Sequence, residues 1–249
     1  MILKNGIAII VFAITWAIAI QADGVSTGGI LIDPGHSPKS SGTISCSGIS
    51  EYRYNAALAK TVSTYLKNKQ IPVALTHREN EEVTLLARTL KSSNKDLLLS
   101  LHHDSVQPRY LYKQSRLNGY CSEKTKGFSI FVSRKNPYFK KSVRYANALG
   151  SALLKRGLSP TLHHAEAIAG ENRELLVPDK GIYIYDDLIV LKNAKSPAVL
   201  LEAAVIVNPD DDKLAGDEKY QLLIADSIYE MISIYKIKVV GIRDTRVIQ

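Results

Sequence analysis

The sequence predicts an α/β fold: a single domain with a largely parallel twisted sheet and helices on both faces. From about residue 28, short apolar runs alternate with amphipathic stretches, without internal repeats or a low-complexity linker. Several of these runs are apolar throughout, which is typical of strands that are covered on both faces of a parallel sheet. The chain has 249 residues, of which 45% are hydrophobic, so it can form one large core.

The first half of this pattern contains three predicted strands and two predicted helices. Apolar runs predict strands over 28–35, 71–77 and 96–102, the first of them ended by a Pro-Gly pair. A helix is expected over 51–69, because an apolar residue recurs every fourth position and Ser50 can cap its start. A second helix is expected over 81–94.

The second half begins with a long polar segment, 104–126, before a strand over 127–133. A helix follows, with a face set by Phe139, Val143, Ala146, Gly150 and Leu153. A loop is expected over 158–181, and the type of the element over 182–191 stays open. A strand over 197–207 and a helix over 217–235 complete the domain.

The amino terminus resembles a secretory signal peptide over residues 1–22. Lys4 precedes an apolar run over 6–20, and small residues follow it, including Ala22. The alternatives are an uncleaved membrane anchor and a buried helix, but about 20 apolar residues are needed to span a bilayer. We therefore expect an exported protein without a stable membrane span after cleavage. The periplasm is favoured, with secretion or cell-wall association as the other destinations.

The net charge indicates which binding partners to expect, and the two cysteines allow one disulfide. Removal of residues 1–22 takes away one lysine and no acid, so the formal net charge changes from +8 to +7. Outside the cytoplasm such a protein favours cell-wall polymers or membrane surfaces over nucleic acid. Cys46 and Cys121 are the two cysteines, and an exported chain can join them in one disulfide.

Four polar side chains are candidates for chemistry, because parallel sheets bind ligands at the carboxyl ends of their strands. His36 follows the first strand, His102 ends the third, Glu202 lies near the end of the run over 197–203 in the last strand, and Glu51 opens the first helix. Two imidazoles and one carboxylate are a normal ligand set for a catalytic zinc ion. Zinc would lower the pKa of a water molecule and make hydroxide available, and a further carboxylate would act as general base and acid.

Each candidate also has a structural interpretation. His36 could belong to a turn, His102 could be a core histidine, and Glu51 could complement the amino end of its helix. Glu202 is harder to explain in this way, because a carboxylate in an apolar strand is costly to bury without a partner.

The motifs around these residues resemble those of the zinc-dependent N-acetylmuramoyl-L-alanine amidases of bacterial cell walls. The Asp-Pro-Gly-His that ends the family's first strand is present at 33–36, and the helix-opening glutamate with its asparagine is present at Glu51 and Asn55. The family's Ser-Ile-His-Ala-Asn/Asp segment corresponds to 100–104, and its final Pro-Ala-Val-Leu-Val-Glu strand to 197–202, with Asn208 beyond it. The resemblance covers about residues 28–235, within an expected catalytic domain over 28–240.

The resemblance implies one Zn²⁺ per chain, held by His36, Glu51 and His102, with Glu202 as the catalytic residue. The implied reaction is hydrolysis of the peptidoglycan amide between N-acetylmuramic acid and the L-alanine of the stem peptide. Strand alternation alone does not choose between His102 and His103. The family register gives zinc to His102 and leaves His103 as a neighbour that could line the cleft. This chain departs from the family pattern at three positions, Ser37, Ala204 and Val205.

Two longer polar segments each allow more than one interpretation of their role. Between 109 and 126 the chain holds one acid, five basic residues and three tyrosines, Tyr110, Tyr112 and Tyr120. They could form a flap over the zinc cleft, tied down by a Cys46–Cys121 disulfide, or a solvated loop. The loop over 158–181 contains His163, His164, Glu166 and Glu171. It could be an accessory metal site or a self-inhibiting segment, although a solvated loop is favoured.

Two other functions compete with the amidase. One is a zinc peptidase that cuts within the stem peptide, although the sequence lacks His-Glu-x-x-His. The other is a catalytically silent wall-binding protein, which the complete set of four candidates disfavours. The sequence contains no separate wall-binding domain, so targeting is expected from the catalytic domain or from an activator or targeting protein. We expect a monomer.

Overall fold

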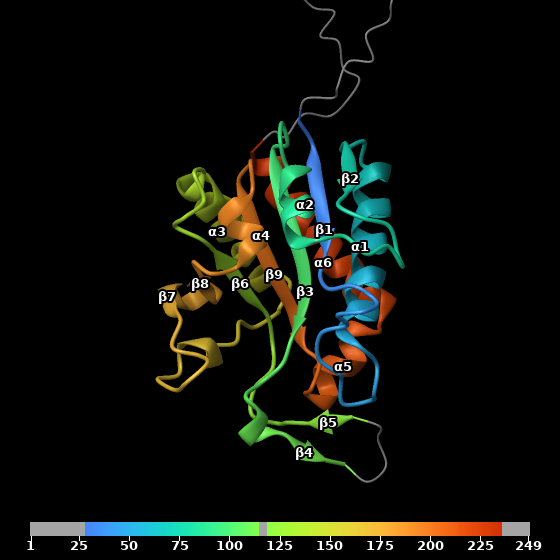
Figure 1. The fold of residues 1–249 in the computed structure, drawn as a ribbon, viewed down its shortest axis with the longest axis vertical. Helices are drawn as coiled ribbons and strands as arrows, with labels where there is room; N and C mark the ends of the chain where they lie inside the picture. Colours follow the sequence, from blue (N-terminus) through green and yellow to red (C-terminus); the bar gives the residue numbers. More distant parts are fainter. Residues whose placement is uncertain (1–27, 115–118, 236–249) are drawn as a thin grey trace, which may run out of the picture.

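A seven-stranded sheet forms the centre of the protein, with strand order β2-β1-β3-β9-β6-β8-β7 (Figure 1). The structure is a computed structural model and describes residues 28–114 and 119–235. The strands of this sheet are β1 (Ile30–Pro34), β2 (Val73–Leu75), β3 (Leu97–Asp104), β6 (Ser129–Val132), β7 (Glu174–Val177), β8 (Ile182–Ile184) and β9 (Ala198–Val205).

The sheet is largely parallel, as the sequence predicts. β1 pairs in parallel with β2 and β3, β3 with β9, and β6 with β8. β6 runs antiparallel to β9, and β7 runs antiparallel to β8. Parallel neighbours need a crossover connection, usually a helix. Between β3 and β6 the described residues, 105–114 and 119–128, form no α-helix, and the chain returns from the end at which β3 leaves the sheet, so β6 runs in the opposite direction.

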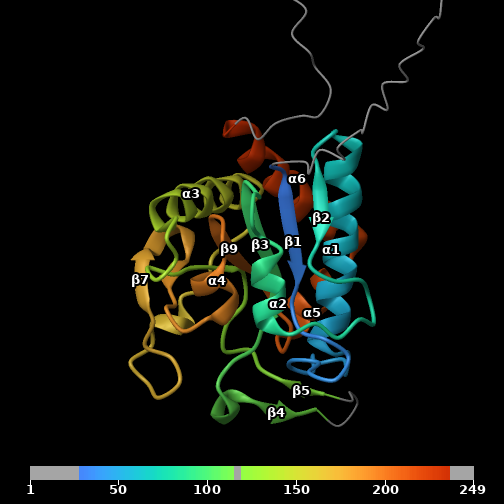
Figure 2. The same cartoon turned by 45° about the horizontal axis from the view of Figure 1, so that its top comes forward.

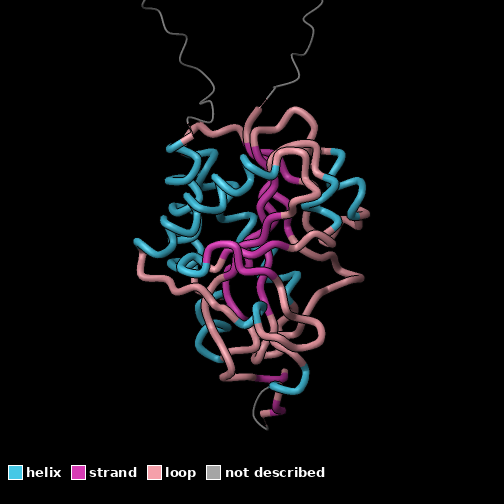
Figure 3. The backbone as a smooth tube through the Cα atoms, turned by 90° about the vertical axis from the view of Figure 1, so that its left-hand side faces the viewer, coloured by secondary structure: helices cyan, strands magenta, loops and turns pink. Residues whose placement is uncertain are grey.

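Helices cover both faces of the sheet (Figures 2 and 3). One face packs against α1 (Glu51–Asn68), α3 (Phe139–Lys155) and α6 (Glu218–Ile234), in the larger apolar cluster. The other face packs against α4 (Ile189–Asn193), and α2 (Leu85–Leu90) contacts α4. The apolar side chains of β1 alternate between these clusters, since Ile30 and Ile32 enter the first and Leu31 enters the second. The predicted fold class is therefore confirmed.

Several element predictions are corrected by the structure. The expected helix over 81–94 is shorter, because α2 starts only after Thr84, whose side chain accepts a hydrogen bond from the Ala87 amide. Ser50 precedes α1 but makes no capping hydrogen bond through its side chain. The segment over 182–191 divides into β8 and α4. The expected loop over 158–181 contains β7, and α5 (Pro209–Ala215) was not predicted as a separate helix.

The polar segment over 104–126 forms a small antiparallel hairpin, β4 (Tyr112–Lys113) and β5 (Tyr120–Cys121), at the lower end of the molecule in Figure 1. A disulfide joins Cys46 to Cys121, with 4.6 Å between their Cα atoms, so the predicted pairing is confirmed. Backbone hydrogen bonds from Cys46 to Ile206 and from Ser122 to Val207 fix both ends of this link to the segment that follows β9.

The predicted signal peptide, residues 1–22, lies outside the described residues, as does the end of the expected domain at residue 240. Both boundaries therefore stay predictions. Among the helices that the structure describes, none is long and apolar enough to cross a membrane.

Candidate active site and metal centre

Three of the four candidate residues meet at the carboxyl end of β1 and β3. His36 Nε2 lies 2.9 Å from Glu51 Oε2, and His102 Nδ1 lies 3.0 Å from Glu51 Oε1. The three ligand atoms all lie within 4.8 Å of one another. Glu51 is almost completely buried between the two imidazoles, while both rings are partly exposed. A buried carboxylate between two imidazoles that face open space is an arrangement that can bind a metal ion.

Neighbouring groups hold each of these side chains in place. The Ser40 carbonyl accepts a hydrogen bond from His36 Nδ1 at 3.1 Å, which directs His36 Nε2 toward Glu51. The Thr43 amide donates to Glu51 Oε2 at 3.2 Å, and Asn55 Nδ2 donates to Glu51 Oε1 at 3.1 Å. Hydrogen bonds of this kind fix the orientation of metal ligands in proteins. They explain why the asparagine lies one helical turn after the glutamate.

Two glycines leave the space that the ligand side chains occupy. A Cβ atom on Gly35 would lie 2.5 Å from both ring nitrogens of His102. A Cβ atom on Gly42 would lie 2.8 Å from His36 Nε2 and closer still to Glu51 Oε2. Real Cβ atoms essentially never approach other atoms so closely, so only glycine fits at these positions without a shift. His36 itself has a φ of 67°, a left-handed conformation that is uncommon for a residue with a side chain.

Arg88 holds the turn that presents His36, and the sequence analysis did not identify it. Its guanidinium donates to the Pro34 carbonyl at 2.9 Å and to the His36 carbonyl at 2.6 Å. It also lies 3.5 Å from Asp33, which is fully buried and accepts hydrogen bonds from Thr76 and Ser100. The one available signal was an arginine among the apolar residues of a short helix. That signal does not reveal which carbonyl groups the arginine reaches.

The charges in the cluster favour an ionised carboxylate. Burial would raise the pKa of Glu51, but hydrogen bonds and charge from His102 and His36 lower it far below its ordinary value. Burial would lower the pKa of His36, but the Glu51 carboxylate and the Ser40 carbonyl raise it above its ordinary value. Two imidazoles and one ionised carboxylate are a ligand set that fits a zinc ion. The residues present are therefore compatible with the expected metal.

Glu202 lies beside this cluster, because it pairs with His102 in the register of β9 against β3. The residue is partly exposed, but its Oε2 atom is buried and has no hydrogen-bond partner within the described residues. Burial of the carboxyl group, with the nearby charges of Asp104 and Glu51, raises its pKa well above the ordinary value. Glu202, His36 and His102 line one cleft of about 610 Å³, together with Arg88.

His103 has a different position from the one expected. The sequence left it free to line the cleft, but the side chain is buried on the α1 side of β3. Its Nδ1 donates to Asn55 Oδ1 at 2.7 Å, and burial lowers its pKa to about 4. His103 therefore supports Asn55, which in turn holds Glu51. Successive side chains of a strand point to opposite faces of the sheet, so His102 and His103 lie on different sides of β3.

The described part of the hairpin does not form the flap that was considered over the cleft. The cleft is lined by residues from 33–40, 82–88, 102, 188–190 and 200–202, and by none of the hairpin residues that the structure describes. Tyr112 and Tyr120 are exposed, and the Tyr110 hydroxyl donates to Glu166 at 3.2 Å. Lys124 also pairs with Glu166, at 2.9 Å. These contacts join the hairpin segment to the loop over 158–181, and Arg116 lies outside the described residues.

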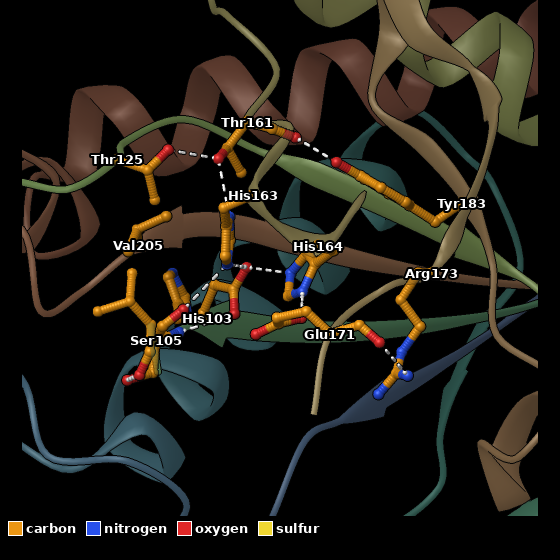
Figure 4. A network of polar contacts seen from close by, with 12 residues as sticks. His103, Ser105, Thr125, Thr161, His163, His164, Glu171, Arg173, Tyr183 and Val205 are labelled. Atoms are coloured by element: carbon orange, nitrogen blue, oxygen red, sulfur yellow. Dashed lines mark hydrogen bonds and ion pairs between the residues drawn. The ribbon is translucent and has the colours of Figure 1, made fainter. Parts of the chain in front are cut away.

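The histidines of the loop over 158–181 are not solvated, which corrects the favoured expectation. His163 is buried, and His164 Nε2 lies 2.7 Å from Asp104 Oδ2 (Figure 4). Asp104, His163 and His164 form a second group whose ligand atoms lie within 4.8 Å of one another. Glu166 does not belong to this group, because it is paired with Lys124.

Comparisons with known proteins give the family. The sequence model of the family described as N-acetylmuramoyl-L-alanine amidase matches residues 30–233. A putative N-acetylmuramoyl-L-alanine amidase of Buchnera aphidicola subsp. Schizaphis graminum is 26% identical, over 82% of this chain and 95% of its own length.

Two solved structures have the same fold. The catalytic domain of CwlV, an N-acetylmuramoyl-L-alanine amidase from Bacillus (Paenibacillus) polymyxa var. colistinus, superposes with a TM-score of 0.63 at 24% identity, covering 84% of this chain and 98% of that one. The CwlD amidase from Clostridioides difficile, in complex with the GerS lipoprotein, has a TM-score of 0.60 at 21% identity, covering 84% and 98%. The family match extends over nearly all of the described sheet and contains all four candidate residues, which confirms the predicted family and enzyme class. The chain belongs to the N-acetylmuramoyl-L-alanine amidase family.

Proposed function

We propose that this protein is a zinc-dependent amidase that hydrolyses the peptidoglycan amide between N-acetylmuramic acid and the L-alanine of the stem peptide. One observation carries the proposal. His36, Glu51 and His102 converge on one point, and beside them Glu202 has a buried carboxylate oxygen with no hydrogen-bond partner among the residues that the structure describes.

In this proposal His36 Nε2, Glu51 and His102 Nδ1 hold one zinc ion per chain. Zinc at such a site polarises a carbonyl group and activates water at neutral pH. The residues of the chain orient and protect the site. Asn55 and the Thr43 amide keep Glu51 in position, and the Ser40 carbonyl accepts a hydrogen bond from His36 Nδ1, which leaves Nε2 as the ring nitrogen for the metal.

Glu202 is the proposed general base and acid. Its carboxylate accepts a proton from the attacking water, and the same proton passes to the departing alanine nitrogen as the amide C–N bond breaks. The products are a lactyl carboxylate on the sugar and a free amino group on L-alanine. Burial and the neighbouring carboxylates raise the pKa of Glu202, so it can hold the proton between these two transfers.

Digestion of purified sacculi tests the proposal against its two rivals. The amidase releases peptides with a new L-alanine amino terminus. A stem peptidase instead exposes an internal residue of the stem, and a wall-binding protein exposes none. Identification of the new amino terminus by chemical labelling and mass spectrometry separates these outcomes. A terminus other than L-alanine would overturn the proposed bond.

The role of Glu202 is tested by Glu202→Gln. This variant should keep its metal content and lose about 10²- to 10⁴-fold in turnover, the range expected for the loss of a general acid–base. His77→Ala is the matched control, because His77 is buried at the end of another strand and lies in neither metal cluster. An active Glu202→Gln protein with bound zinc would exclude the assigned role. Removal of zinc with a chelator should abolish turnover in the wild type.

We also propose that the protein is exported, acts as a monomer in the periplasm or at the cell wall, and works with an activator or targeting partner. The net charge of +7 expected after removal of residues 1–22 supports an anionic wall polymer as substrate, and the CwlD structure contains a lipoprotein partner. Amino-terminal sequencing of the protein from a periplasmic fraction, with light scattering of the purified chain, tests export and oligomeric state. An uncleaved cytoplasmic protein would contradict this part of the proposal.

A further inference from the structure

We propose that Asp104, His163 and His164 form a second metal site, distinct from the first, that takes Zn²⁺ or a divalent cation with similar ligand preferences. The two sites share no residue, and the second joins the end of β3 to the loop that follows α3. The inference does not depend on zinc at the first site.

The geometry directs three ligand atoms to one point. His164 Nε2 lies 2.7 Å and His163 Nε2 lies 3.6 Å from the same carboxylate oxygen, Asp104 Oδ2. The ring centroids of His163 and His164 lie 3.9 Å apart, and Figure 4 shows the two imidazoles side by side. The Ser105 carbonyl oxygen, 3.2 Å from His163 Nε2, is a further possible metal ligand. Two imidazoles with carboxylate and carbonyl oxygens suit Zn²⁺.

The other ring nitrogen of each histidine has its own partner. His163 Nδ1 lies 2.8 Å from Thr161 Oγ1, and His164 Nδ1 lies 2.8 Å from Glu171 Oε2. Gln107 Nε2 donates to Glu171 Oε1 at 2.9 Å and holds that carboxylate in place. Metal-binding histidines nearly always have such a partner, often a carboxylate, on the nitrogen that does not bind the metal. Both His163 and His164 have such a partner on Nδ1.

The side chains of this second group are largely buried, unlike those of a cluster on the protein surface. The side chains of Asp104 and His164 are about nine-tenths buried, at 10% and 12% exposure, and His163 is at 5%. His164 also packs edge-on against Phe131 and Tyr183, with ring centroids 5.0 Å and 5.5 Å away. A buried carboxylate is costly unless the group is paired or coordinates an ion.

The same residues could instead form an ion pair, with a protonated His164 between Asp104 and Glu171. Such a pair needs no metal and leaves His163 outside it, in contact with Thr161 and the Ser105 carbonyl. Under the metal proposal, Nε2 of both histidines faces Asp104 because both bind the cation. The two states differ in a measurable quantity, the metal content of the protein.

Metal analysis of the full-length chain tests the inference. The protein is stripped with a chelator, loaded with Zn²⁺, desalted and measured by mass spectrometry of the metal. We expect two zinc equivalents in the wild type and in the His77→Ala control. One equivalent is expected in the double variant His163→Ala/His164→Ala, and one in His36→Ala/His102→Ala.

The outcomes separate this inference from the proposed function. An unchanged metal content in His163→Ala/His164→Ala overturns the second site and leaves the first intact. Loss of all zinc from His36→Ala/His102→Ala also overturns the second site. If instead that variant keeps one equivalent, the second site stands, even where His163→Ala/His164→Ala fails to fold. A wild type with one equivalent, lost only in His163→Ala/His164→Ala, supports the second site and contradicts zinc at the first.

Discussion

The substitution Gly35→Ala tests the argument that backbone space in the first turn determines the metal centre. Gly35 precedes His36 in the chain, but its Cα faces the ring of His102 on the neighbouring strand. Its backbone is not in the left-handed region, so alanine carries no conformational penalty there. The effect of the added methyl group therefore comes from contact with His102.

The size of the effect follows from the distances. The new Cβ would lie 2.5 Å from Nδ1 and Nε2 of His102, and ordinary contact begins at 3.4 Å. The ring must therefore move by about 0.9 Å, which is a large part of the 3.0 Å that separates His102 Nδ1 from Glu51. A displacement of about 1 Å in a catalytic site can cost about 100-fold in rate. Overpacking of a filled interior costs about 1 to 3 kcal/mol of stability.

The assay measures turnover on sacculi, zinc content and thermal unfolding. We expect Gly35→Ala to fold, to bind zinc more weakly and to lose about 100-fold in turnover. Gly216→Ala is the matched control, because Gly216 has a φ of −83° and a Cβ there would meet nothing closer than 3.7 Å. Wild-type turnover and zinc content in Gly35→Ala would refute the steric argument.

The other predictions concern the disulfide, the second histidine and a surface ion pair. The double variant Cys46→Ser/Cys121→Ser should lose up to about 4 kcal/mol in denaturant unfolding, since the bond closes a loop of 75 residues; equal stability of oxidised wild type and variant would contradict this. His102→Ala should abolish zinc binding at the first site, whereas His103→Ala should keep the metal with affinity reduced about 10- to 100-fold, because His103 acts through Asn55. Equal losses in a zinc titration would mean that the two histidines have equivalent roles. Asp226 accepts hydrogen bonds from Tyr65 and Arg156, which lower its pKa. Asp226→Asn should therefore cost about 1 kcal/mol or less at neutral pH, because the carboxylate is partly exposed and screened. This difference should shrink as the pH falls below about 4 and the wild-type carboxylate takes up a proton. A difference that persists at lower pH in acid unfolding would refute the assignment.

The sequence by itself determined the fold class, because burial on both faces of a parallel sheet requires apolar runs that are visible in the chain. It also located the four candidate residues, since His36, His102 and Glu202 lie in or directly after predicted strands and Glu51 opens a predicted helix. Side-chain alternation alone did not choose between the two neighbouring histidines. Only the structure decided that His103 is buried behind the strand and supports Asn55.

The tertiary structure alone decided the contacts between segments that lack a periodic pattern. The loop after α3 has a polar sequence, and nothing in it shows that His164 reaches Asp104, 60 residues earlier in the chain. Arg88 likewise appears as one charge in a short helix, until the sheet brings the carbonyls of Pro34 and His36 within its reach. Local periodicity specifies which face of an element is buried, so a sequence can reveal it. Partners across 50 or more residues are set by how the strands assemble, and this information exists only in the folded chain.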